Sequence, residues 1–196
     1  MILNEEFNMK SIKVLVPLAC GYEETEAVTV IDVLRRAEIE VLVASLDGES
    51  LVKGANGITI QTDLQVKDVD VATLNMIVLP GGWGGTHALA EDENIQKILK
   101  EMDAKGKNIG AICAAPFALN KAGVLKHNFT CYPSVEEQIR LDGYQGDKYT
   151  VVEDANVMTS RGVGTALCFA LAIVKKLKGE KTYNALKAGL LAQCCE

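Results

Sequence analysis

The sequence predicts an α/β sandwich, in which a parallel sheet carries helices on both faces. Two observations predict this fold class. Short runs of β-branched and apolar residues alternate along the chain with longer helical patterns, as in successive βαβ units. The 196 residues, of which 48% are hydrophobic and 23% charged, also have the composition of a globular protein with one sizeable core.

The predicted strands are short apolar runs, as in the segment IKVLVPL at residues 12–18. Such runs are typical of strands that are buried on both faces of a parallel sheet. Gly54 and Gly57, which stand between apolar residues, predict a small hairpin over residues 51–60. The other strands are expected at residues 40–44, 75–79, 108–112, 149–152 and 156–159.

Helices are predicted where apolar residues recur with the helical period. In residues 24–37, four apolar residues from Ala27 to Leu34 occupy positions i, i+3, i+4 and i+7. The nearly all-apolar segment 165–178 is expected to be a buried helix that ends at Gly179. Further helices are expected at residues 93–105, 114–121 and 181–192.

Composition limits the classes of partner. No linker rich in Pro, Gly or Ser divides the chain, so we expect one domain over residues 9–196, with residues 1–8 as an extension or an alternative start. The net charge of −6 argues against a nucleic-acid partner, because phosphate binding needs a basic face. The apolar run 166–174 is far shorter than the roughly 20 residues of a membrane span. A cytoplasmic protein without a membrane partner is therefore expected.

The six cysteines predict neither a zinc site nor a disulfide framework. They show no CxxC spacing, and the chain has only two histidines. Free thiols in a reducing compartment are expected, with Cys168 in the core, Cys131 inert in a strand, and Cys194 and Cys195 exposed at the tail. Cys20 lies beside the expected site and is a candidate for a resolving or modified thiol.

Cys113 is the sharpest candidate for chemistry. It follows the strand 108–112 and precedes a helix, so its thiol is expected at a strand–helix turn. Ligands bind beyond the carboxyl ends of the strands in open α/β sheets. Free backbone N–H groups and the positive end of the helix dipole would lower the pKa of the thiol there. The alternative is a buried structural cysteine.

Glu26 is the second candidate. It shares a helix face with Val30 and Val33, and a carboxyl on an apolar stripe has a raised pKa that favours the neutral acid. A neutral acid beside a thiolate can donate a hydrogen bond and then transfer protons. Spacing alone does not separate Glu26 from Glu23 and Glu24, which also stand in the first turn of this helix.

The glycines after the strand 75–79 suggest an oxyanion hole. The segment Pro80-Gly81-Gly82 lets the backbone approach a ligand, and the N–H of Gly82 would face that of Ala114. The alternative is a tight strand-to-helix turn. Trp83 is expected either in a pocket or in the core, and His87 and His127 are expected to be solvated rather than catalytic.

Four motifs together resemble the DJ-1/ThiJ/PfpI superfamily, and within it the bacterial members of the DJ-1 branch. They are Gly21-Tyr-Glu-Glu-Thr-Glu26, Leu79-Pro-Gly-Gly82, Ala111-Ile-Cys-Ala-Ala-Pro116 and Thr159-Ser-Arg-Gly-Val-Gly-Thr165. The resemblance spans about residues 12–192. It implies a flavodoxin-like three-layer sandwich with a mostly parallel central sheet, and usually a homodimer. It assigns Cys113 as the nucleophile-elbow cysteine, Glu26 as its acid partner, and Gly82 and Ala114 as backbone oxyanion donors.

The chain also departs from the superfamily. Tyr132 stands where some members have a histidine near the cysteine, so Tyr132 is a candidate auxiliary group. Asn56 stands where some members have a hairpin arginine. Ala114 replaces the histidine that follows the cysteine in protease-like members, and the His-x-Glu of class I amidotransferases is absent. Peptidase and amidotransferase chemistry are therefore disfavoured.

The resemblance implies one of two functions. The first is a glyoxalase- or deglycase-type enzyme for methylglyoxal, glyoxal and their adducts, which needs no metal or organic cofactor. The second is a redox sensor and chaperone that works through oxidation of Cys113 without turnover. In both, Cys113 and Glu26 carry the chemistry.

Overall fold

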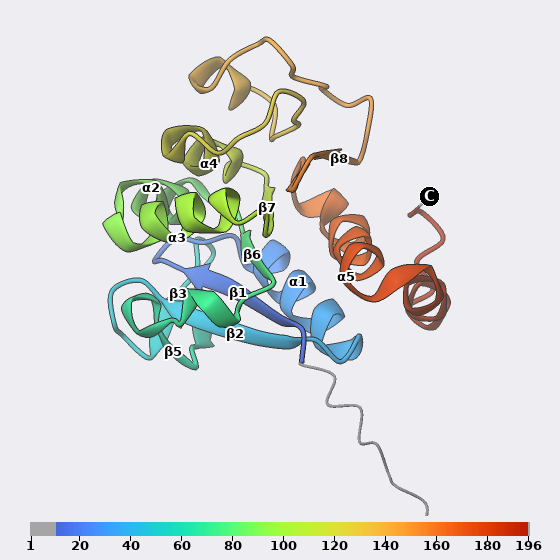
Figure 1. The fold of residues 1–196 in the computed structure, drawn as a ribbon, viewed down its shortest axis with the longest axis horizontal. Helices are drawn as coiled ribbons and strands as arrows, with labels where there is room; N and C mark the ends of the chain where they lie inside the picture. The colour runs from blue at the N-terminus through green and yellow to red at the C-terminus, as the bar shows by residue number, and fades with distance from the viewer. Residues whose placement is uncertain (1–10, 196) are drawn as a thin grey trace, which may run out of the picture.

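The computed structural model describes residues 11–195 and centres on a seven-stranded sheet (Figure 1). The strand order is β5-β2-β1-β6-β7-β9-β8, and every pairing within it is parallel except that of β8 with β9. A separate hairpin pairs β3 with β4. The strands are β1 (Lys13–Leu18), β2 (Glu40–Ser45), β3 (Leu51–Lys53), β4 (Thr59–Gln61), β5 (Leu64–Gln65), β6 (Met76–Leu79), β7 (Asn108–Ile112), β8 (Val151–Asp154) and β9 (Val157–Ser160).

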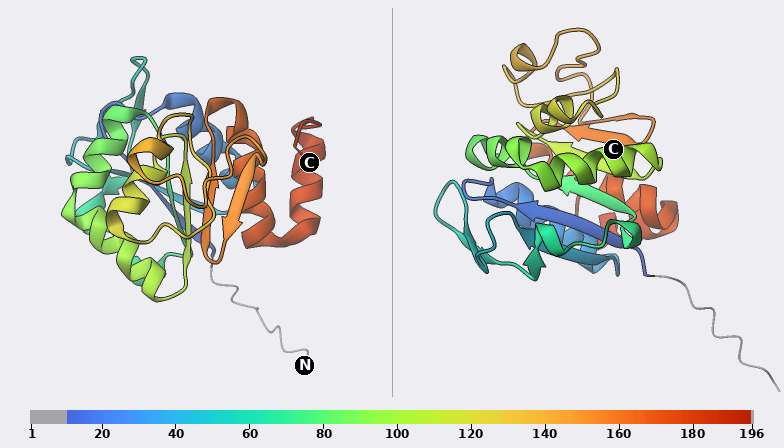
Figure 2. Two further views of the ribbon diagram at one scale, coloured as in Figure 1. Left: turned by 90° about the horizontal axis from the view of Figure 1, so that it is seen from above. Right: turned by 60° about the vertical axis from the view of Figure 1, so that its left-hand side comes forward.

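Helices cover both faces of the sheet, which confirms the predicted three-layer sandwich (Figure 2). The first face packs against α1 (Glu24–Arg36) and the amino-terminal part of α5 (Ala166–Gly189). The second packs against α2 (Trp83–Glu91), α3 (Glu93–Ala104) and α4 (Pro116–Ala122). Short 3₁₀ turns occupy Val66–Asp68, Val71–Thr73, Glu136–Gln138 and Val163–Thr165.

The central strands form because their residues are apolar on both sides. All four residues of β6 are buried, and so are five of the six residues of β1. A strand between two helical layers has no solvent face, so its sequence lacks the polar alternation of a half-exposed strand. This explains why apolar runs predicted the inner strands well.

Two elements were not predicted. The residues of α2 begin Trp-Gly-Gly, and glycine has a low helix propensity, so the pattern did not indicate a helix there. The strand β5 has two residues, which is too short for a period to show. Both elements form because the sheet and the neighbouring helices provide a surface for them.

The long helix α5 contains a break at Gly179. This residue has φ 83° and ψ 172°, which no helix accommodates and which glycine adopts without a steric penalty. The break divides α5 into the two helices that the sequence predicts. The second part lies at the outer edge of the molecule, beside the first (Figure 2).

The expectation of free thiols throughout was wrong. Cys168, near the start of α5, forms a disulfide with Cys195, in the turn after α5. Cys195 is buried rather than exposed, while Cys194 is exposed as expected. The separation of 27 residues gave no spacing signal, because the break at Gly179 is what returns the chain end to the start of the helix.

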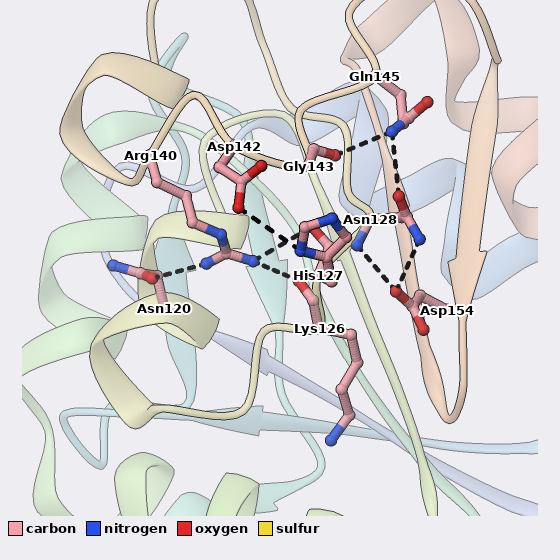
Figure 3. Close-up of polar contacts among 9 residues, drawn as sticks. All are labelled: Asn120, Lys126, His127, Asn128, Arg140, Asp142, Gly143, Gln145 and Asp154. Atoms are coloured by element: carbon pink, nitrogen blue, oxygen red, sulfur yellow. Dashed lines mark hydrogen bonds and ion pairs between the residues drawn. The ribbon is translucent and has the colours of Figure 1, made fainter.

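A long excursion over residues 123–150 joins α4 to β8, and polar contacts fix its course (Figure 3). The Arg140 guanidinium donates to two consecutive backbone carbonyls, the second of which belongs to His127. At the other end, Asp154 Oδ2 accepts from the backbone N–H of Asn128 at 2.8 Å and from its side-chain amide at 3.2 Å. Both contacts hold the chain at residues 126–128, one through Arg140 within the excursion and one through Asp154 at the end of β8.

The strand order places a reversal at the centre of the sheet. From β1 the chain moves through α1 to β2 at one side, and after β5 it crosses to β6 and proceeds to β7 at the other. Open α/β sheets bind ligands at the carboxyl ends of the strands where the order reverses. The segments that follow β1, β6 and β7 meet at this edge. Among the described residues, no helix is both long and apolar enough to cross a membrane. The predicted extension at residues 1–8 lies outside the described residues.

Candidate functional site

Cys113 stands directly after β7 in a left-handed backbone conformation. Its φ is 63°, which is uncommon for a residue other than glycine and typical of sharp strand-to-helix turns that present a nucleophile. Its backbone N–H donates to the carbonyl of Ser160 at 3.0 Å, and its carbonyl accepts from the N–H of Tyr132 at 2.9 Å. Two neighbouring segments therefore hold this strained residue in place.

Glu26 enters the site from the first turn of α1. Glu23 caps this helix and accepts a hydrogen bond from the Glu26 N–H at 2.7 Å, so the start of the helix is fixed. The Glu26 side chain is fully buried. Its Oε2 accepts from the N–H of Gly81 at 2.8 Å, while its Oε1 has no hydrogen-bond partner among the described residues. One carboxylate oxygen of Glu26 thus accepts a backbone hydrogen bond, and the other can still accept or donate one.

The structure separates the three glutamates of this turn. Glu24 is also buried, but its carboxylate accepts from the backbone N–H of Asn56 at 2.5 Å and from that residue's side-chain amide at 3.0 Å. It therefore anchors the β3–β4 hairpin to α1. Glu23 caps the helix. Only Glu26 of the three faces Cys113.

Gly81 makes the approach of Cys113 to Glu26 possible. A Cβ at this position would lie 2.6 Å from the Cβ of Cys113, 2.7 Å from Oε2 of Glu26 and 3.0 Å from Sγ of Cys113. No side chain fits there. The sequence pattern indicates a role for Gly82 but not for Gly81, because the close packing of Gly81 and the donation from its N–H to Glu26 both depend on tertiary contacts.

Two backbone N–H groups point at the Cys113 thiol. They belong to Gly82, which has φ 85° at the start of α2, and to Ala114, the residue after the cysteine. Gly82 is packed so closely that a Cβ there would lie 2.5 Å from the carbonyl oxygen of Gly21. These are the two donors named from the sequence, and together they can stabilise negative charge on sulfur or on an oxygen bonded next to it.

Burial dominates the electrostatics of the pair. It raises the pKa of Glu26 to about 7, against the opposing effects of the Gly81 N–H and the facing Cys113 thiol. Burial and the facing Glu26 carboxylate raise the pKa of the Cys113 thiol to about 12, while the N–H groups of Gly82 and Ala114 act to lower it. The expected low thiol pKa is therefore wrong for the state in which Glu26 is ionised, because burial outweighs the backbone donors.

Above the pKa of Glu26, which is about 7, the two groups together hold one proton, mainly on the sulfur. The thiol pKa is raised partly by the Glu26 carboxylate, so a proton on Glu26 removes that repulsion and favours the thiolate. The pair can hold its proton on sulfur or on the carboxyl. This arrangement suits a thiol that reacts while its proton moves to a neighbouring base.

The other candidates lie around this pair or outside it. Tyr132 is 53% exposed and its ring faces Gly162, where a Cβ would lie 3.3 Å from the ring. Cys20 is exposed, and Cys131 is buried in a loop rather than a strand, with its Sγ 3.9 Å from Glu136.

The aromatic residues form a separate cluster. His87 stacks on Trp83 with 5.0 Å between ring centroids, and Phe117 packs edge-on to both. His127 is exposed, with its Nδ1 3.8 Å from a carboxylate oxygen of Asp142 (Figure 3). Neither histidine is among the groups that contact the Cys113 thiol or the Glu26 carboxyl.

Comparisons with known proteins relate this chain to one protein family. A model of the DJ-1/PfpI family matches residues 12–176. Protein dj-1beta of Drosophila melanogaster is 42% identical over 178 residues, which are 90% of this chain and 95% of that protein. The glutathione-independent glyoxalase DJR-1.2 of Caenorhabditis elegans is 40% identical over 185 residues, 94% of this chain and 98% of that protein. The crystal structure of the Drosophila DJ-1beta superposes with a TM-score of 0.89, covering 92% of this chain and 98% of that one.

Proposed function

The chain belongs to the DJ-1/PfpI family, and from this premise we propose that it is a cysteine-dependent enzyme of carbonyl stress. The proposed substrates are methylglyoxal or glyoxal and their adducts. The observation that carries the proposal is the meeting of one thiol, one buried carboxyl and two backbone N–H groups at Cys113. The name of the glyoxalase relative supports the same class of reaction.

The first step is addition of the Cys113 thiol to the aldehyde carbon of methylglyoxal. Glu26, as the carboxylate, accepts the thiol proton while the carbon–sulfur bond forms and the carbonyl oxygen becomes an alkoxide. The N–H groups of Gly82 and Ala114 donate to that oxygen. Glu26 then returns the proton to the oxygen, which leaves a neutral hemithioacetal on Cys113.

The second step moves a proton between two carbons of the bound substrate. Glu26 removes the proton from the former aldehyde carbon and delivers it to the neighbouring carbon through an enediol, while the hydroxyl proton passes from the former aldehyde oxygen to the former ketone oxygen. The product is a lactate thioester on Cys113. Water then cleaves the thioester, which releases lactate and restores the thiol. The net reaction adds one water to methylglyoxal without an external oxidant, and a base with a pKa of about 7 can serve in both directions.

The same steps on a methylglyoxal adduct of a protein or nucleotide would amount to deglycation. Here the amine or thiol of the adduct leaves when Cys113 adds to the glycated carbon. The later proton transfer and hydrolysis are unchanged. This finer assignment depends on access of large substrates to Cys113, which a turnover assay with a glycated peptide measures directly.

The test is methylglyoxal-to-lactate turnover, followed by NMR in metal-free buffer. Wild type should produce lactate, Cys113→Ser should not, and Glu26→Gln should lose nearly all turnover. Glu38→Gln, an exposed carboxyl at the far end of α1, is the matched control and should retain it. Turnover that survives in Cys113→Ser or in Glu26→Gln would overturn the proposal.

A second candidate function, that of a redox sensor and chaperone, is supported by the oxygen of Glu26 that has no hydrogen-bond partner among the described residues. Hydrogen peroxide would convert Cys113 to the sulfenic and then the sulfinic acid. The buried Oε1 of a protonated Glu26 can donate to a sulfinate oxygen, and the Gly82 and Ala114 N–H groups face the same sulfur. A redox sensor and chaperone would then need no turnover. Peroxide titration with intact-mass detection should show two added oxygen atoms on Cys113 before other thiols react; oxidation spread over all free cysteines would exclude it.

We also propose a cytoplasmic homodimer, with the first helix at the dimer surface. Val28 on α1 is 47% exposed, and Leu51 and Ile58 of the adjoining hairpin region are 61% and 58% exposed. Exposed apolar residues on neighbouring elements are typical of an interface between protein chains.

A further inference from the structure

Three cysteines meet at the carboxyl-terminal end of the chain, and the proposed reaction uses none of them. Cys168 and Cys195 are joined in the disulfide. Cys194 is an exposed free thiol whose Sγ lies 4.0 Å from that of Cys195. All three sulfur atoms lie within 4.8 Å of one another. A free thiol is thus placed next to a disulfide that it can exchange with.

The disulfide borders a cavity of about 420 Å³. Both of its cysteines line this cavity, together with Lys148, Tyr149 and Lys175. Cys168 is only partly buried, whereas Cys195 is buried, so Cys168 is the more exposed residue of the two. None of Cys113, Glu26, Gly82 and Ala114 lines the cavity, so it is a second location and not an extension of the candidate active site.

The charge of the cavity favours a negative ligand. Lys148 and Lys175 line it, and no carboxylate is among its described lining residues. Lys175 pairs with Glu180 at 2.7 Å, which offsets part of its charge. Lys148 lies over the ring of Tyr149 at 5.1 Å and has no ion-pair partner among the described residues. A lysine without a carboxylate partner raises the local concentration of small anions.

We propose that Cys168, Cys194 and Cys195 form a thiol–disulfide exchange site that takes a small thiol carrying carboxylate groups. The thiolate of this ligand attacks Sγ of Cys168. The Cys168–Cys195 bond breaks, Cys195 leaves as a thiolate that takes a proton from water, and a mixed disulfide forms on Cys168.

The mixed disulfide can be resolved by two reactions. The Cys194 thiolate can attack Sγ of Cys168, which expels the ligand as a thiolate and leaves a Cys168–Cys194 disulfide. Alternatively, a second ligand thiolate attacks the sulfur of the bound ligand. That step releases the ligand disulfide and leaves Cys168 reduced, so two ligand thiols are oxidised and one protein disulfide is reduced.

The experiment compares two thiols of opposite charge on the full-length oxidised protein. Reduced glutathione carries two carboxylates, and cysteamine carries an ammonium group. Mixed-disulfide formation is followed by intact mass and peptide mapping, and each rate is divided by the thiolate concentration of the reagent. We expect glutathione to react at Cys168 about tenfold faster than cysteamine. Lys148→Gln should bring the ratio close to one, while Lys181→Gln, an exposed lysine outside the cavity, should leave it unchanged.

Three results would overturn the proposal. They are equal rates for the two thiols in wild type, adducts confined to cysteines other than Cys168 and Cys195, and six free thiols in protein purified without reductant. Cys194→Ser should prolong the mixed disulfide, and far-UV circular dichroism shows that each variant is folded. The outcome is independent of lactate turnover, so the proposed function and this site can fail separately.

Discussion

The carboxyl group of Glu26 and the thiol of Cys113 lie within hydrogen-bonding reach of each other in the space that Gly81 leaves empty. Three separate segments contribute to this contact: the start of α1, the turn after β6 and the turn after β7. The contact is also the reason that the two groups titrate together.

Gly81→Ala should disrupt the contact by steric overlap. The new methyl group would lie 2.6 Å from the Cβ of Cys113 and 2.7 Å from Glu26 Oε2, so the site must shift. We expect a loss of about 1–3 kcal/mol in the free energy of unfolding, measured in urea, with loss of lactate turnover. Gly164→Ala is the control, since its Cβ would meet nothing within 4 Å. Equal stability of Gly81→Ala and Gly164→Ala would contradict the close packing around Gly81.

Glu26→Gln should stabilise the protein at high pH. The pKa of Glu26 is raised from 4.5 to about 7, so folding favours the protonated acid. Its contribution to stability is fully present below pH 4.5 and is lost as the pH rises through about 7. The glutamine variant lacks this loss, so it should exceed wild type by about 3 kcal/mol above pH 8 and by little at pH 4.5. Urea unfolding across this pH range measures the difference, and a pH-independent difference would exclude the raised pKa.

Reduction of the disulfide should destabilise the carboxyl-terminal part of α5. Closing a loop between cysteines separated by 27 positions in the sequence restricts the unfolded chain by about 3–4 kcal/mol in the chain-entropy model. Cys168→Ser and the double variant with Cys195→Ser should lose the same amount, because neither can form a disulfide at position 168. Cys194→Ser should lose much less. Unfolding curves with and without reductant test this, and additive losses in the double variant would argue against the bond.

Tyr132→His should raise turnover. The position adjoins Cys113 through the hydrogen bond between its N–H and the cysteine carbonyl. Histidine is the usual proton shuttle near neutral pH and would assist Glu26. We expect kcat to rise about tenfold, with a new pH dependence near 6.5. Unchanged kcat and pH profile would show that Glu26 alone supplies the proton transfer.

Val28→Asp should weaken the proposed dimer. A buried carboxylate at an apolar interface loses its hydration without a partner. Light scattering across a concentration series should show wild type as a dimer and the variant shifted toward monomer. The exposed charge reversal Lys181→Glu should leave the dimer intact. A monomeric wild type would rule out the interface.

The inner strands and α1 were predictable because local pattern and burial agree. In β6 and β1, every core position is an apolar residue, so periodicity alone indicates the element. The end of the predicted helix at Gly179 was also predictable, because this glycine has a backbone conformation that interrupts a helix. The short strand β5 and the glycine-rich start of α2 carry no such local signal, since neighbouring layers stabilise them.

The candidate site was predictable in its side chains but less so in its energetics. Cys113 and Glu26 were named from position and resemblance, and the structure brings them together. The predicted direction of the pKa shift of the Cys113 thiol was wrong, because the sequence shows the helix N-terminus but not the burial around Sγ. The Cys168–Cys195 bond was missed, because it depends on how the chain returns after Gly179.

The use of backbone groups around Cys113 has a consequence for protein engineering. The donors to Glu26 and to sulfur are the N–H groups of Gly81, Gly82 and Ala114, which every residue except proline carries. Among the groups proposed to react, only Cys113 and Glu26 therefore contribute side chains. A library that leaves these and the glycines untouched, and varies exposed neighbours such as Tyr132, would change substrate preference while the reactive core persists.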